Sequence, residues 1–123
     1  MLIAYWIIAG LLALIYLFAG GTKLIRPQEA LASSGMGWAA DSPAGVVKLI
    51  GAVEVLGAVG LILPPITGVA PVLAPVAAIG LVLVQLGAMI VHGRRGEAKM
   101  IPANIVLAAL AAAAAILGFL VWS

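Results

Sequence analysis

Long apolar stretches, separated by short polar segments, make up most of the chain. Four of these stretches, about residues 2–25, 43–63, 71–92 and 103–122, carry few charges. Each is long enough for a transmembrane helix, which needs about 20 mostly apolar residues. The pattern therefore predicts a single all-α domain over residues 1–123, an integral membrane bundle of four transmembrane helices.

Serine, proline and glycine mark the expected ends of these helices. Ser42 is expected to cap the second helix with its hydroxyl. Pro64 and Pro65 are expected to end that helix, because proline lacks the backbone N–H that a helix interior needs. In the third helix, Pro75 is expected to cause a bend and Gly93 to provide a left-handed end.

The segment between the first two spans predicts an interfacial element. Residues 27–32 are typical of a short helix lying at the membrane interface, and residues 33–38 of a flexible stretch. Trp38 is expected to anchor this loop, because Trp and Tyr are enriched at membrane–water interfaces. The segment is either a hinged gate to the bundle or a simple connector, and the sequence leaves both interpretations open.

Composition excludes several classes of protein. The chain is 66% apolar and 8% charged, with a mean hydropathy of +1.33, whereas soluble domains average roughly 45–50% apolar and about 25% charged residues. These values exclude a soluble enzyme, a disordered tail and a DNA-binding module. The net charge of +2 is not a nucleic-acid footprint either, because the chain has no basic patch mixed with aromatic residues.

Positive charge is confined to one side of the expected bundle. With four spans, the loops 26–42 and 93–102 lie on the same side, and every Lys and Arg lies in or beside them. The positive-inside rule then predicts that both loops are cytoplasmic and both termini outside, in a multi-pass protein of the cell membrane. Tyr5, Trp6 and Trp122 are expected to form an outer aromatic belt. The six basic residues are Lys23, Arg26, Lys48, Arg94, Arg95 and Lys99.

The lack of cysteine and the single histidine limit the chemistry of the chain. With no cysteine, disulfides, thiol redox chemistry, iron–sulfur ligation and thiolate zinc sites are excluded. With one histidine, a bis-histidine haem within one subunit is excluded as well. The sequence therefore predicts no metal site and no cofactor held by this chain alone, apart from a bound quinone.

Glu54 is the most informative residue, because it lies near the middle of the second span. A carboxylate at that depth costs a few kcal/mol on insertion scales. Gly51, Gly57 and Ala58 share its helical face, and small residues mark faces where membrane helices approach closely. Glu54 should therefore point into the bundle, either to handle protons or ligand, or to hold two helices together by a structural hydrogen bond.

Other polar residues share the expected depth and face of Glu54. At a rise of about 1.5 Å per residue, Tyr16 on the first span and Gln85 on the third are expected in the same layer. A shallower layer, nearer the cytoplasm, is expected to hold Lys23, Lys48, His92 and Asn104. The layers predict a pocket that opens to the cytoplasm and has apolar walls, which suits a lipophilic ligand with polar head groups, such as a quinone.

Simpler interpretations compete for several of these residues. His92 lies at a helix end, where it is expected to be a cap or interface residue. Lys23 either pairs with Glu54 by reaching inward or extends to the cytoplasmic phosphates, and extension is the default expectation. The run Arg94-Arg95-Gly-Glu97 is expected to anchor the topology and to contain an internal ion pair. The small residues 108–115 form a packing surface, used either inside the bundle or in a homo-oligomer.

Several short motifs follow one another in a fixed order and spacing. They are Ala19-Gly-Gly-Thr-Lys-Leu24 with Pro27 behind it, Ile50-Gly-Ala-Val-Glu-Val-Leu-Gly-Ala-Val-Gly-Leu-Ile-Leu-Pro64, Thr67-Gly68, the Pro71–Pro75 region, Ala78-Ile-Gly-Leu81, Gly87-Ala88, His92 and Arg94-Arg95-Gly-Glu97. In this order they resemble the DoxX-like family of small four-helix membrane proteins. The resemblance covers nearly the whole chain.

The resemblance implies an architecture more than an activity. Most members of the family have no assigned function, while some relatives are linked to thiosulfate:quinone oxidoreductases and others to membrane-associated oxidoreductase assemblies. The motif positions carried over to this chain are Lys23, Glu54, His92, Arg95 and Glu97. Because the chain has no cysteine, it would supply only a quinone site or an anchor, with the redox centre elsewhere.

Two functions therefore remain open. The first is an accessory or quinone-binding component of a membrane oxidoreductase system, in which Glu54→Gln keeps the fold and loses the ligand. The second is a purely structural or assembly subunit that forms a homo-oligomer or anchors other membrane subunits, in which Glu54→Gln is tolerated. Whether the chain catalyses a reaction does not follow from the sequence.

Overall fold

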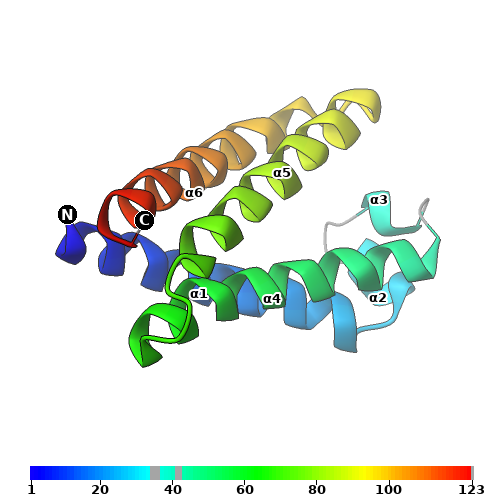
Figure 1. Ribbon diagram of the computed structural model, residues 1–123. Coiled ribbons are helices and arrows are strands. Elements are labelled where there is room, and N and C mark those ends of the chain that lie inside the picture. Colours follow the sequence, from blue (N-terminus) through cyan, green and yellow to red (C-terminus); the bar gives the residue numbers. More distant parts are fainter. Residues whose placement is uncertain (34–36, 41–42, 123) are drawn as a thin grey trace.

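The computed structural model describes residues 1–33, 37–40 and 43–122. Four helices are long and apolar enough to cross a membrane, and the described residues contain no strand. Ser42 and its expected cap lie outside the described residues. In chain order the elements are α1 (Leu2–Ile25), α2 (Gln28–Ser33), α3 (Gly37–Ala40), α4 (Ala44–Thr67), α5 (Leu73–Arg94), the 3₁₀ helix η1 (Ala98–Met100) and α6 (Ile101–Trp122) (Figure 1).

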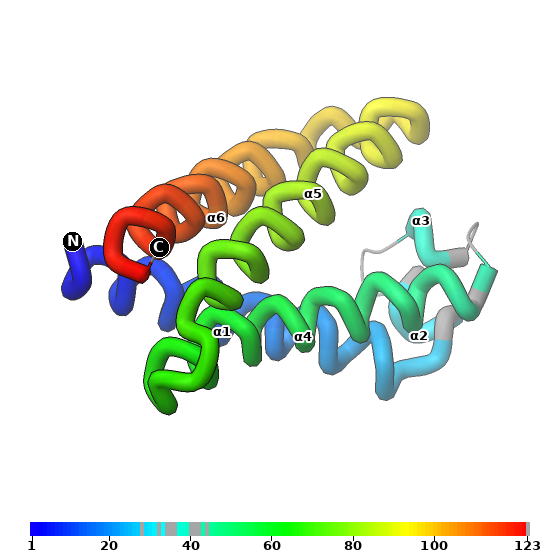
Figure 2. The backbone as a smooth tube through the Cα atoms, in the orientation of Figure 1, coloured from blue at the N-terminus to red at the C-terminus, as the bar shows by residue number. Residues whose placement is uncertain are grey.

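The four long helices form two antiparallel hairpins. α1 packs along α4, and α5 packs along α6, while α4 contacts α5 and α1 contacts α6. Figures 1 and 2 show the hairpins close together at the end that holds both termini and the α4–α5 turn. They diverge toward the opposite end, which holds α2, α3 and η1 and is called the basic end below because the Lys and Arg residues cluster there. The bundle is therefore wedge-shaped.

Glycines allow the closest helix contacts. A Cβ atom at Gly20 of α1 would lie 2.7 Å from the carbonyl oxygen of Gly51 on α4, and a Cβ atom at Gly51 would lie 2.8 Å from the carbonyl oxygen of Gly20. At Gly57, a Cβ atom would lie 2.6 Å from the side chain of Leu81 on α5. Membrane helices associate through such small residues, because burial from water contributes little between helices in lipid.

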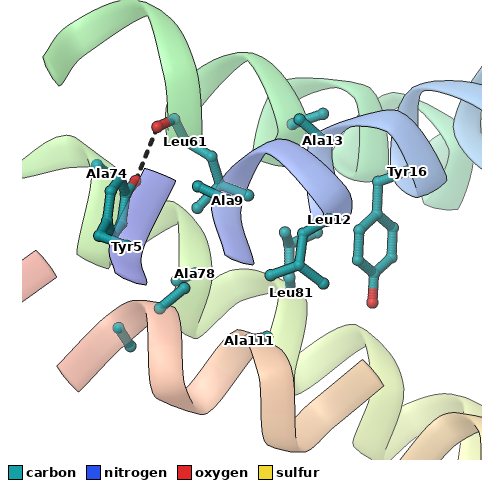
Figure 3. Packing of buried hydrophobic residues seen from close by; sticks show 13 residues of the cluster. Tyr5, Ala9, Leu12, Ala13, Tyr16, Leu61, Ala74, Ala78, Leu81 and Ala111 are labelled. Atoms are coloured by element: carbon teal, nitrogen blue, oxygen red, sulfur yellow. Dashed lines mark hydrogen bonds between the residues drawn. The ribbon is translucent and has the colours of Figure 1, made fainter. Parts of the chain in front are cut away.

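Small and aromatic side chains fill the core between the helices. Tyr5, Leu12 and Leu81 are completely buried there (Figure 3). The alanine run of α6 contributes Ala111 and Ala114, both of which are also completely buried. One face of the run 108–115 thus serves the interior of the bundle, which is one of the two uses expected from the sequence.

The predicted end of the second span at Pro64 and Pro65 is wrong. α4 continues through both prolines to Thr67, and Gly68 ends it in the left-handed conformation, with φ 76°. The N–H of Gly68 donates to the carbonyl oxygen of Pro64, which closes the last turn. Both prolines therefore lie in the final turns of α4, where only two backbone donors are lost.

Tyr5 compensates for one of these lost donors. Pro65 has no N–H to offer the carbonyl of Leu61, and the Tyr5 hydroxyl donates to that oxygen instead, at 2.7 Å (Figure 3). Trp122 and Trp6 pack edge-on against the Tyr5 ring, at centroid distances of 4.6 and 5.4 Å. The Tyr5 ring is buried within the bundle, so its hydroxyl serves the backbone of α4, and the expected interfacial belt of Tyr5, Trp6 and Trp122 stays a prediction.

The two ends of α5 also differ from the expectation. The helix begins at Leu73, so Pro75 lies in its first turn, where no N–H is needed and no bend follows from the proline. Gly93 lies inside the helix, and the residue with positive φ is Gly96, at 71°. The N–H groups of Gly96 and Glu97 donate to the carbonyls of Gly93 and His92, respectively, which is a Schellman-type helix end.

The described part of the segment between α1 and α4 contains two short helices. The short helix expected over 27–32 is present as α2. Of the stretch expected to be flexible, residues 34–36 lie outside the described residues, whereas the last two residues open the helix α3. Trp38 packs against a small cluster formed by Leu31, Ala39 and Val47, so it contacts the bundle as well as lying in the loop.

Candidate functional site

A cavity of about 460 Å³ lies between the two hairpins. Most of its lining is aliphatic, with side chains from α1, α4, α5 and α6 and with Trp38 of α3 and Met100 of η1 at the basic end. All six polar residues that the sequence singled out as ligand or proton candidates line this cavity. They are Tyr16, Lys23, Glu54, Gln85, His92 and Asn104.

Lys23 and Glu54 form a buried ion pair on the α1–α4 wall of the cavity. Lys23 Nζ lies 2.6 Å from Glu54 Oε1, and the two residues are only 7% and 3% exposed. The expectation that Lys23 extends to the lipid phosphates is therefore wrong. The contact between Gly20 and Gly51 explains the pairing, because it brings α1 and α4 together one turn from both side chains.

A chain of hydrogen bonds links three helices across the cavity. Asn104 of α6 donates through Nδ2 to Gln85 Oε1 of α5 at 2.7 Å, and Gln85 Nε2 donates to the Tyr16 hydroxyl of α1 at 2.6 Å. Asn104 Oδ1 is buried, and among the described residues it has no hydrogen-bond partner. The Tyr16 oxygen accepts from Gln85, so its own proton is directed elsewhere. The chain thus offers one acceptor and one hydroxyl donor.

These bonds connect the two layers that the sequence predicts as separate. Tyr16 and Gln85 share a layer as expected, but Asn104 bonds to Gln85, and Lys23 bonds to Glu54. The helical rise per residue predicts that the two layers lie at different depths, and the long side chains are able to reach from one layer to the other. Lys48 does not join them: it is exposed and donates to the carbonyl of Leu24 at 3.0 Å, at the end of α1.

A second polar cluster lies beside the cavity at the basic end. Glu97 Oε1 lies 3.1 Å from both His92 Nδ1 and Arg95 Nε. These contacts lower the pKa of Glu97, chiefly through the hydrogen bond from His92 and further through the Arg95 guanidinium. A carboxylate only accepts, so Nδ1 carries the proton, and Nε2 is the ring nitrogen left for the cavity that His92 lines.

The turn at the end of α5 produces this cluster. The positive φ of Gly96 reverses the chain and brings Glu97 back over His92. The internal ion pair expected in the run Arg94-Arg95-Gly-Glu97 is present between Arg95 and Glu97. The participation of His92 did not follow from the sequence, because it depends on the reversal at Gly96 rather than at Gly93.

Trp38 is a cavity residue that the sequence analysis did not place in the site. Its ring centroid lies 6.0 Å from Lys23 Nζ, so the ring and the ion pair face the same space. The available signal was an aromatic residue flanked by small residues, Gly37 and Ala39, in a loop. A Cβ atom at Gly37 would lie 3.1 Å from the guanidinium of Arg95, so α3 also contacts the α5 end.

The site combines a mostly apolar wall with a few groups that bind oxygen atoms or exchange protons. Its polar groups are a carboxylate–ammonium pair, a phenol, two amides and an imidazole. Across the residues that the structure describes, no group of three His, Cys, Asp or Glu side chains is placed to hold a metal ion. The arrangement favours binding of an uncharged lipophile with hydrogen-bonding groups.

Four long apolar helices in two hairpins define an integral membrane protein of the four-helix class. Residues 7–114 match the model of the DoxX-like family, and the chain belongs to that family. The match confirms the resemblance found in the sequence motifs. No curated protein and no solved structure matches the chain.

Proposed function

We propose that the protein binds a quinone, or a similar lipophile with oxygen-bearing head groups, in the cavity between its hairpins. In this proposal it is an accessory or quinone-binding component of a membrane oxidoreductase system. One observation carries the proposal: polar side chains from all four long helices line a single, mostly apolar cavity, and one of them, Asn104, has a buried oxygen with no hydrogen-bond partner in the part of the chain that the structure describes.

The size and lining of the cavity suit such a head group. Small-molecule sites occupy about 300–1,000 Å³, with apolar walls and a few polar groups that fix orientation. The volume of about 460 Å³ lies in the lower part of this range. A substituted aromatic ring fits this description better than a charged metabolite, because the Lys23–Glu54 pair already neutralises its own charges.

The hydrogen-bond chain matches both redox forms of a quinone. In the arrangement described, the Asn104 carbonyl accepts from a quinol hydroxyl, and the Tyr16 hydroxyl donates to a quinone carbonyl. If the side-chain amides of Gln85 and Asn104 both turn by about 180°, their oxygen and nitrogen atoms exchange places. Tyr16 then donates to Gln85, Gln85 donates to Asn104, and Asn104 presents its amino group to a quinone carbonyl. An unpaired buried polar group costs about 1–3 kcal/mol, so a ligand that pairs Asn104 Oδ1 recovers that cost.

Conversion between quinone and quinol moves two protons with two electrons. Glu54 is the group proposed to exchange both protons with the bound head group, one after the other, and Lys23 or His92 the group that relays each proton to or from the basic end. A partner subunit would supply or accept the electrons. We place the basic end in the cytoplasm and both termini outside, in the cell membrane, because every Lys and Arg lies at that end.

Purification with native mass spectrometry tests the proposal. Ala88 lines the cavity, whereas Ala109 lies on the exposed surface of α6. The protein extracted in mild detergent is expected to carry a molecule of quinone mass. Ala88→Phe fills the cavity and should abolish the adduct, while the matched variant Ala109→Phe should keep it. Full occupancy in Ala88→Phe would contradict the proposal.

The same spectra report on the alternative, a structural or assembly subunit. The small-residue face expected to mediate association, which includes Ala111, is buried within the protein's own bundle. An oligomer would need another surface. A homo-oligomer or a protein partner, free of small molecules and unchanged in Ala88→Phe, would support the assembly function instead.

A further inference from the structure

A second, smaller cavity of about 200 Å³ lies on the seam between α4 and α5. Every residue that lines it is apolar, and two of them are glycines. The lining residues are Val53, Leu56, Gly57, Ala77, Gly80 and Leu81. We propose that this groove binds the single long isoprenoid or alkyl tail of the molecule whose head group occupies the larger cavity, an inference that rests on the proposed function.

The two cavities follow one another along the same seam. On α4, Ile50 lines the larger cavity, and Val53, one turn further, lines the groove. On α5, Val84 lines the larger cavity, and Gly80, one turn earlier, lines the groove. At about 1.5 Å per residue, the path from Ile50 to Leu56 is about 9 Å long, so several carbons of a tail lie along it.

The crossing of α4 and α5 limits the groove at one end. A Cβ atom at Gly60 would lie 2.8 Å from Ala77 Cβ, and one at Gly57 would lie 2.6 Å from Leu81. Beyond this crossing the two helices diverge toward the basic end (Figure 2). A Cβ atom at Gly80 would meet nothing within 4 Å. The groove therefore has a closed end at the crossing and open space at Gly80, and its other end lies one helical turn from residues that line the larger cavity.

The seam also differs from the α1–α4 seam in its accessibility. Gly20 and Gly51 close the α1–α4 seam by backbone contact. Along the α4–α5 seam, Leu56 and Leu83 are 69% and 62% exposed. In a bilayer these side chains face acyl chains. A tail leaving the larger cavity by this route stays in apolar surroundings along its whole length.

The test separates the tail from the head group. Two probes carry the same benzoquinone head, one without a tail and one with a ten-carbon alkyl tail. Their binding to the detergent-solubilised protein is followed by quenching of tryptophan fluorescence, since Trp38 lines the larger cavity. The proteins are wild type, Gly80→Leu, and the control Gly10→Leu, at a position where a Cβ also meets nothing within 4 Å and which lines neither cavity.

We expect Gly80→Leu to raise the Kd of the tailed probe about five- to tenfold while changing that of the tail-free probe less than about twofold, with Gly10→Leu changing neither. If wild type binds the tail-free probe, but Gly80→Leu affects both probes alike or neither, the tail groove is overturned and the proposed function stands. If wild type binds neither probe, both proposals are overturned.

Discussion

At the scale of the residue, the Lys23–Glu54 pair is the most consequential contact. Both side chains are buried at 2.6 Å from one another, so neither is separately available to water. Removing one member of such a pair is strongly destabilising, whereas replacing both by apolar residues is often neutral. The pair therefore allows stability and function to be tested apart.

Glu54→Leu is expected to lower the free energy of unfolding by about 3–5 kcal/mol, because it leaves the Lys23 ammonium buried without a partner. The double variant Lys23→Met/Glu54→Leu should recover most of that loss. Unfolding in mixed detergent micelles measures both. A double variant as unstable as the single one would contradict the pairing. Glu54→Gln keeps an oxygen for Lys23, so it remains the variant of choice for ligand binding.

Tyr5 supports the backbone of α4 at the opposite end of the molecule. Tyr5→Phe should cost about 1–3 kcal/mol, because it leaves the Leu61 carbonyl without a donor. Pro65→Ala restores a backbone N–H at that carbonyl, so Tyr5→Phe should cost less in the Pro65→Ala background. Thermal unfolding of wild type, the two single variants and the double variant gives the four stabilities of this double-mutant cycle. Equal costs in both backgrounds would show that the hydroxyl does not substitute for the missing N–H.

Six site residues were predicted from the sequence because a polar side chain in an apolar span must face other protein groups. The partners were not predictable in the same way. Lys23 pairs with Glu54 and Asn104 with Gln85 because of helix spacing and side-chain reach, which a count of residues along each helix does not contain. Whether these residues bind a ligand stays a prediction.

At the scale of the element, the long helices were predictable, and their ends were less so. The first span agrees with the prediction at both ends. α4 runs four residues beyond the predicted end, since a contact distant in sequence, Tyr5 to Leu61, replaces a backbone bond that Pro65 removes. The predicted end of α5 at Gly93 is wrong because two glycines, Gly93 and Gly96, lie near the end of the helix and only Gly96 has positive φ.

The α1–α4 pairing should be sensitive to a single methyl group. Gly51→Ala places a Cβ atom 2.8 Å from both the Gly20 carbonyl oxygen and Lys23 Cβ, which should cost about 1–3 kcal/mol through overpacking. Gly10→Ala, where the added atom meets nothing within 4 Å, should instead stabilise α1 by up to about 1 kcal/mol. If Gly51→Ala and Gly10→Ala change the thermal stability in the same direction, the close contact between Gly20 and Gly51 is contradicted.

The turn after α5 should respond to acid. The hydrogen bond from His92 and the Arg95 guanidinium lower the pKa of Glu97 from its ordinary value of 4.5. A lowered pKa means that the contribution to stability is present above pH 4.5 and is lost as the pH falls through the lowered value. Thermal unfolding should show this loss in wild type and not in Glu97→Gln. A pH profile that Glu97→Gln leaves unchanged would exclude a contribution from this carboxylate.

At the scale of the whole molecule, the wedge shape combines a closed end with an open one. Tyr5, Trp6 and Trp122 pack together at the closed end, and the cavity lies between the diverging helices. The sequence predicts the number of helices and the polar faces directed inward, since both follow from hydropathy. It does not predict the divergence, which depends on where the glycine contacts fall along each pair.

The orientation of the molecule in the membrane is the prediction that belongs to this scale. A reporter active only outside the cytoplasm, fused after Ser123, should be active, because the basic end is expected to stay in the cytoplasm. A reporter inserted in the loop after α5 should be inactive. The reverse pattern would overturn the orientation and would place the opening of the cavity on the other side.

The distribution of polar contacts between the hairpins has a consequence for how the protein enters the membrane. Lys23 and Glu54 belong to consecutive spans, as do Gln85 and Asn104. Each pair can therefore form as soon as its own hairpin leaves the insertion machinery, before the other hairpin is present. The Gln85–Tyr16 hydrogen bond, by contrast, joins the two hairpins and must wait for both. The newly made chain can thus enter lipid as two units in which Glu54 is already paired with Lys23, and Gln85 with Asn104, so that assembly of the cavity is the last step.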